Sequence, residues 1–122
     1  MTADEIIDLI AKERNLTISY TDDRDNCHIA GNEIFIGMYS DNEFKLISFF
    51  HELGHKNLQK YPYSTLLTEL ECWHMGIEIA KAYDILFSDR AIKFGFEKAL
   101  TYVGHDEREN SGYNKKLLWI NK

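Results

Sequence analysis

The chain carries the stretch His51-Glu52-Leu53-Gly54-His55 near the middle of its 122 residues. Apolar side chains recur before and after it at three- and four-residue spacing, which predicts a helix over residues 41–58. Residues four apart lie on the same face of a helix, one turn from each other. Because both imidazoles can then bind one tetrahedral ion, we expect a Zn2+ site that includes His51 and His55.

Glu52 directly follows the first histidine of the pair. At this position a carboxylate projects to the side of the two histidines, where it reaches a zinc-bound water rather than the zinc itself. Bound zinc lowers the pKa of its water towards neutrality, and a neighbouring carboxylate can take the proton as the water attacks a carbonyl group. Glu52 is therefore the candidate catalytic base, and the pattern predicts a zinc hydrolase.

A catalytic zinc has three protein ligands and one open position, so the histidine pair needs a third partner. The next predicted helix offers two glutamates, Glu69 and Glu71. They lie about 200° apart around a helix, so at most one of them faces the metal well. Spacing alone leaves both candidates open.

Two segments, residues 46–55 and residues 69–73, resemble the ImmA/IrrE family of small zinc metallopeptidases. In that family a helix ending in HELGH is followed by a helix with an E-x-E-A motif, whose second glutamate is the third zinc ligand. The resemblance therefore implies that Glu71 binds the metal and that the reaction is hydrolysis of a peptide bond. It also implies a protein or peptide substrate, with a regulatory protein such as a repressor as the target.

The segment Asn32–Gly37 resembles the strand that precedes the active-site helix in the same family and forms an edge along the substrate cleft. Counted with the two helices, the resemblance covers residues 16–80. By analogy we expect an extended substrate to pair with this edge near residues 34–36. Backbone pairing there presents a carbonyl group without requiring a particular substrate sequence.

Three further residues are candidates for stabilising the transition state or for orienting the ligands. His74 lies three residues after Glu71, and Tyr61 and Tyr63 lie between the two predicted zinc-bearing helices. An imidazole or a phenol can donate a hydrogen bond to the developing oxyanion. A partly buried histidine and tyrosines beside a proline also have ordinary packing roles, so both interpretations stay open at this point.

The remaining patterns predict an α+β fold, a minimal zincin-like domain over residues 1–122 in which a small antiparallel sheet packs on the helices. Strands are expected at residues 16–20 and as a hairpin over 28–36 that turns at Gly31-Asn32. A fourth helix should bury an apolar stripe of Ile92, Phe96 and Leu100. Capping residues mark the starts of the four helices: Thr2 with Glu5, Ser40 with Glu43, Ser64 or Thr65, and Ser88-Asp89.

Composition limits the partners and the location. The chain has 14 Lys+Arg against 20 Asp+Glu and a formal net charge of -6, and its basic residues are scattered, which argues against a nucleic-acid surface. No segment approaches the roughly 18 apolar residues of a membrane span, and the acidic N-terminus is unlike a secretory signal. We therefore expect a cytoplasmic protein, with its last apolar run, Leu117–Ile120, packed against the rest.

Two other functions fit the same residues. One is a zincin-like interaction protein that keeps the helix pair but has no turnover, since Glu52 is necessary for hydrolysis and not sufficient. The other is a zinc hydrolase that acts on a non-peptide amide.

Overall fold

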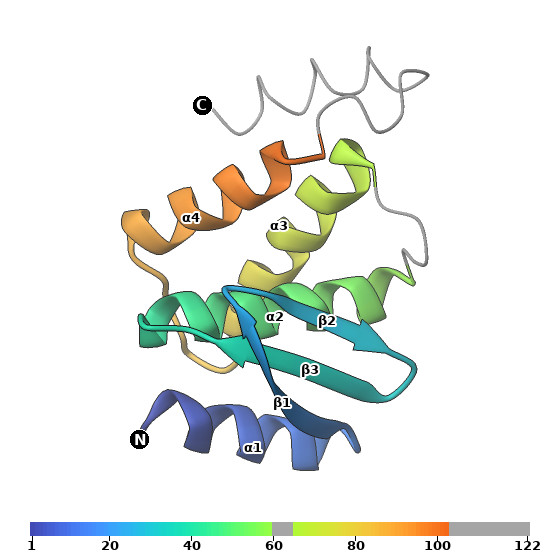
Figure 1. Cartoon of the computed structure of the whole chain (residues 1–122), viewed down its shortest axis with the longest axis vertical. Coiled ribbons are helices and arrows are strands. Elements are labelled where there is room, and N and C mark those ends of the chain that lie inside the picture. Colours follow the sequence, from blue (N-terminus) through green and yellow to red (C-terminus); the bar gives the residue numbers. More distant parts are fainter. Residues whose placement is uncertain (60–64, 103–122) are drawn as a thin grey trace.

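The structure is a computed structural model that describes residues 1–59 and 65–102. Figure 1 shows α2 running through the middle of the molecule, with α1 and the sheet on one side and α3 and α4 on the other. The α+β class is confirmed, and no helix in the described ranges is long and apolar enough to cross a membrane. The elements are α1 (Ala3–Glu13), β1 (Thr17–Arg24), β2 (Cys27–Ala30), β3 (Glu33–Met38), α2 (Asn42–Leu58), α3 (Leu66–Ala82) and α4 (Asp89–Leu100).

Most helices begin at the expected capping residues. Thr2 forms a reciprocal capping box with Glu5, and Thr65 and Ser88 cap the third and fourth helices. The start of α2 differs, because its N-cap is Asp41 rather than Ser40. The Asp41 carboxylate accepts two backbone N–H groups of the first turn, at 2.9 and 3.0 Å, and its charge suits the positive end of the helix dipole.

The sheet is mixed, so the expectation of an antiparallel sheet is wrong for one of its two strand pairs. The strand order is β1-β3-β2. The hairpin of β2 and β3 is antiparallel as predicted, with Ala30 opposite Glu33 and Gly31 at a φ of 60° in the turn. The first strand, β1, instead pairs with β3 in parallel, on the side of β3 away from β2, with Ile18 opposite Ile34.

This strand order also corrects the predicted substrate edge. Because β3 has hydrogen-bonded neighbours on both sides, its backbone near Ile34–Ile36 is not available to an added strand. The side chains of Ile34 and Ile36 are fully buried as well. Within the described residues the edge strand beside α2 is β2.

Two apolar cores lie on opposite sides of α2. They share this helix because it contacts the sheet and every other helix of the described structure. The first core joins α1, the sheet and the end of α3, and includes Ile7, Ile10, Ile34, Ile36, Phe49, Phe50, Leu53 and Ala80. The second joins α2, α3 and α4, and consists of Ile47, Leu66, Leu70, Trp73, Ala91 and Ala99.

Glycines let α2 and α3 cross in backbone contact. A Cβ atom on Gly54 would lie 2.2 Å from the carbonyl oxygen of Cys72, and one on Gly76 would lie 2.5 Å from that of Phe50. Real Cβ atoms do not approach backbone this closely, so only glycine fits at either position. The crossing therefore fixes the distance between the two helices.

The fourth helix packs most closely through small residues, which corrects Ile92 of the predicted stripe, whereas Phe96 and Leu100 are half-buried against the second core as expected. Its buried residues are Ala91, Gly95 and Ala99, whereas Ile92 is 39% exposed. Trp73 of α3 projects against this face, and its ring would be 2.7 Å from a Cβ on Gly95. Large side chains on this face of α4 would collide with the indole.

Candidate metal centre

The two histidines of α2 converge as their spacing predicts. Both are buried, and their ring centroids are 4.5 Å apart. Each directs its Nε2 atom towards one carboxylate, that of Glu69 on α3. His51 Nε2 lies 3.2 Å from Glu69 Oε1, and His55 Nε2 lies 2.8 Å from Glu69 Oε2.

The carboxylate that lies against the histidines belongs to Glu69 and not to Glu71, the ligand that the family resemblance implies. Glu69 is 2% exposed, whereas Glu71 is half-buried. The reason is the helix crossing. Glu69 is three residues before Cys72 and seven before Gly76, so it shares the face of α3 that meets α2.

The donor atoms of this cluster are only partly satisfied by one another. His51 Nε2 and Glu69 Oε2 are buried and make no well-aligned hydrogen bond. His51 Nε2 nevertheless lies 3.2 Å from Glu69 Oε1, and Glu69 Oε2 lies 2.8 Å from His55 Nε2. Two imidazole nitrogens and a carboxylate oxygen are a ligand set that zinc takes, and tetrahedral ligands on zinc are about 3.3 Å apart. The cluster therefore fits a zinc ion in its donor chemistry, and the two histidine–carboxylate distances, 3.2 and 2.8 Å, are at or below that spacing.

The charged groups of the cluster shift one another's pKa values. Burial by itself lowers the pKa of His51, but the carboxylates of Glu52 and Glu69 outweigh burial and raise the pKa from 6.5 to about 9. Burial by itself raises the pKa of Glu69, but its contacts with His51 and His55 lower it well below its usual 4.5. Without a metal, the site is an ion pair between a carboxylate and an imidazolium.

Glu52 lies in the same buried group, with its Oε2 atom 2.9 Å from Nδ1 of His51. It therefore contacts the ring nitrogen that faces away from Glu69. A hydrogen bond at this nitrogen fixes which nitrogen of the imidazole is left to bind a metal. The same carboxylate lines the cavity beside the histidines.

A cavity of about 190 Å³ opens onto the cluster. One wall comes from the turn before β2 and from β2 itself, and the opposite wall comes from the end of α4. Lys98 Nζ on α4 donates a hydrogen bond of 2.9 Å to the carbonyl oxygen of Asp25 and so joins the two walls. The lining includes Asn26, Cys27, Tyr39, Ser48, His51, Glu52, Glu69, Trp73, Lys98, Thr101 and Tyr102.

Tyr39 and Tyr102 bring phenol groups into this cavity that the sequence patterns do not single out. Burial raises the pKa of Tyr102, and the charges of Glu69 and Glu52 raise it further. Burial also raises the pKa of Tyr39. Both hydroxyls therefore stay protonated at neutral pH and can donate hydrogen bonds.

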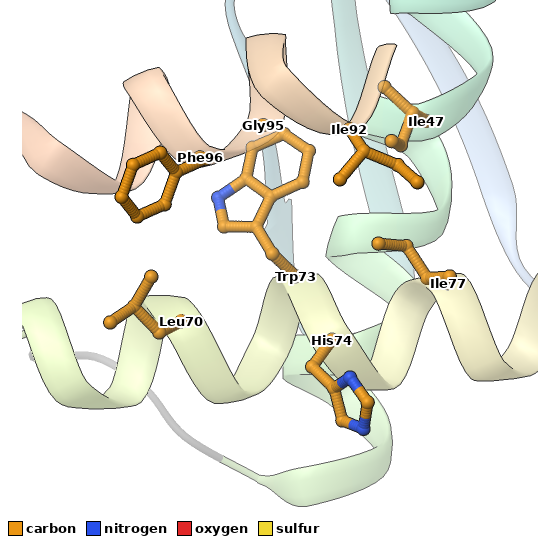
Figure 2. Close-up of a pocket in the computed structure, with 8 residues that line it drawn as sticks. All are labelled: Ile47, Leu70, Trp73, His74, Ile77, Ile92, Gly95 and Phe96. Carbon is orange, nitrogen blue, oxygen red and sulfur yellow. The ribbon is translucent and has the colours of Figure 1, made fainter. Parts of the chain in front are cut away.

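Of the other predicted helpers, only His74 lies in the described part of the chain, and it is not among the residues that line this cavity. His74 is exposed on α3, with its Nε2 atom 4.0 Å from Glu78, and it lies at the rim of a second, apolar cavity of about 260 Å³ (Figure 2). That cavity lies between α3 and α4 and shares only Trp73 with the lining of the first. Tyr61, Tyr63 and the run Leu117–Ile120 lie outside the described residues.

Comparison with family models, with curated proteins and with solved structures finds no match for this chain. The buried His51, Glu52 and His55 group, with Glu69 beside it, is therefore the basis for any functional assignment.

Proposed function

We propose that this protein is a zinc-dependent peptidase in which His51, His55 and Glu69 hold the metal. One observation carries the proposal: two helices that cross in backbone contact bring two imidazole nitrogens and one carboxylate together beside a cavity that also holds Glu52. Three ligands of this kind leave one position for water, which is the arrangement of catalytic zinc rather than structural zinc. The ImmA/IrrE resemblance points to the same chemistry.

Zinc, when bound, would act as a Lewis acid on the scissile carbonyl and would lower the pKa of a bound water, so that the water can lose a proton and become the nucleophile. The Glu52 carboxylate would accept the proton of the attacking water and pass it to the leaving amine. Tyr102 donates its phenolic hydrogen bond to the oxygen that becomes negative as the carbonyl is attacked.

The substrate that fits this arrangement is an extended segment of a protein, paired with the outer edge of β2. In support, β2 is an edge strand of the described sheet, and its first residue, Cys27, lines the same cavity as Glu52. Strand addition gives affinity through backbone hydrogen bonds. A small cleft of this kind needs a further docking surface for specificity, which agrees with a regulatory protein as the target.

The proposal is tested by comparing the wild type with Glu52→Gln and with Glu71→Gln as a matched control. Each protein is loaded with zinc, its metal content is measured, and it is incubated with a library of unstructured peptides whose new termini are identified by mass spectrometry. We expect cleavage by the wild type and by Glu71→Gln, and a loss of at least about 100-fold in Glu52→Gln with zinc retained.

Zinc bound by all three proteins with no cleavage of any peptide would contradict a peptidase. A set of small non-peptide amides, tested next, would then identify the alternative hydrolase. Zinc binding without turnover on either set would leave the interaction protein as the explanation.

A further inference from the structure

Trp73 lies flat against the first histidine of the metal cluster. The ring centroids of Trp73 and His51 are 3.9 Å apart, and the two planes differ by 2°. Both side chains are buried, so this contact is shielded from water. The stack leaves the His51 ring little freedom to tilt out of its plane.

The indole of Trp73 also packs against α4. A Cβ atom on Gly95 would lie 2.7 Å from Cε3 of Trp73, so the ring touches the backbone of α4. Figure 2 shows the indole between α3 and α4, directly below Gly95. The indole of Trp73 therefore lies between His51 of α2 and Gly95 of α4.

Two contacts together restrict the orientation of the His51 imidazole. Glu52 Oε2 lies 2.9 Å from Nδ1, which limits rotation of the ring within its own plane. Trp73 covers the face of the ring, which limits rotation out of that plane. Nε2 is then the atom presented to Glu69, at 3.2 Å.

We propose that Trp73 is a positioning residue for the metal centre: its indole, seated on Gly95, holds the His51 ring in the orientation in which Nε2 can bind a metal. This inference rests on the metal site of the proposed function. Trp73 acts through His51 and is not itself a ligand. The apolar cavity beside the indole leaves space into which the ring could otherwise move. The contact with Gly95 is therefore needed to keep the indole against His51.

The test compares Trp73→Leu with Trp73→Phe, since phenylalanine keeps a flat ring and leucine does not. Zinc affinity is measured by competition with a chelator. We expect Trp73→Leu to lower zinc affinity about 10–100-fold, the range for residues that orient a ligand, and Trp73→Phe to recover most of it. Ile77→Ala is the matched control, because Ile77 lines the same apolar cavity one turn further along α3 and is absent from the lining of the metal cavity.

A second measurement separates positioning from general loss of stability. In the metal-free protein, the indole ring current should shift the carbon-bound protons of His51 in NMR spectra, and Trp73→Leu should remove that shift. Unchanged zinc affinity in a folded Trp73→Leu protein would overturn the inference, as would equal losses in all three variants. If the wild type binds no zinc, the proposed function fails, whereas the His51 shifts still report whether Trp73 orients the ring.

Discussion

The two helix contacts that surround the metal cluster differ in kind. Between α2 and α3 the backbones touch, because Gly54 and Gly76 have no side chains to keep them apart. Between α3 and α4 the contact is made by side chains, among them the indole of Trp73 against Gly95, with an apolar cavity of about 260 Å³ beside it. The donor atoms lie at the first contact, and the ring that packs on His51 lies at the second.

The two contacts therefore determine different aspects of the geometry of the metal cluster. Backbone contact cannot adjust without moving whole helices, so it sets the distance between the histidines and Glu69. A side-chain contact can adjust by rotation of one ring, so it sets orientation rather than distance. The predictions that follow probe each contact in turn.

The largest effect is expected where the backbones touch. In Gly76→Ala the new methyl group would meet Phe50 O at 2.5 Å and His51 N at 2.9 Å, and neither atom can move without the helix. We expect a loss of about 3 kcal/mol in the free energy of unfolding, measured by urea denaturation. Gly95→Ala, whose methyl meets a side chain instead, should cost only about 1 kcal/mol. Equal unfolding midpoints for the two variants would show that the contacts are of the same kind.

The second effect is loss of a donor at the first contact. Glu69→Ala removes the carboxylate that faces both histidines, so zinc affinity should fall by more than the roughly 100-fold that outer residues cost. Glu71→Ala, on another face of the same helix, should leave it within about threefold. Chelator competition measures both. A larger loss in Glu71→Ala would restore Glu71 as the ligand that the family resemblance implies.

The third effect concerns pH. Zinc binds a neutral imidazole, and the pKa of His51 in the metal-free protein is raised to about 9. Zinc binding therefore releases a proton below that pH, and zinc affinity should rise about tenfold per pH unit between pH 7 and 9 before levelling off. In Glu52→Gln one of the charges that raises this pKa is gone, so the affinity should level off at a lower pH. A flat profile in the wild type would contradict the ion pair.

The same shift has a consequence for the metal-free protein. The folded-state pKa of His51 is higher than its usual 6.5, so the stability that it contributes is present in full below pH 6.5 and is lost as the pH rises through about 9. Metal-free protein should unfold at lower urea concentration at pH 10 than at pH 6.

The smallest effect is expected at the looser contact. Ile92 lines the apolar cavity and is 39% exposed, so Ile92→Phe can fill part of the space without meeting backbone. We expect a gain of about 0.5 kcal/mol, seen as a higher thermal midpoint. Leu9→Phe on α1 is the control, because Leu9 is 56% exposed and lines none of the described cavities. A similar gain in the control would mean that the cavity does not matter.

Local patterns predicted much of this molecule. Histidines four apart, the capping residues and the Gly31 turn depend on neighbours within a few residues, and the structure confirms their elements. The parallel pairing of β1 depends on contacts distant in the chain, so alternation within residues 16–20 carried no information about it.

The choice between Glu69 and Glu71 likewise depends on contacts between residues distant in the chain. Both glutamates have the spacing of a ligand, and only the crossing of α2 and α3 distinguishes them. Gly54 and Gly76 mark the faces on which α2 and α3 meet. A small residue seven positions after Glu69 was the available signal.

Cys27 at the wall of the metal cavity has a consequence for resistance to chemical damage. Burial raises the pKa of its thiol well above the usual value, and the charge of Glu52 raises it further. Alkylating agents and peroxides react with the thiolate, which is scarce here at neutral pH. We therefore expect the thiol of Cys27, which lines the metal cavity, to react more slowly with such reagents than an exposed, acidic cysteine does.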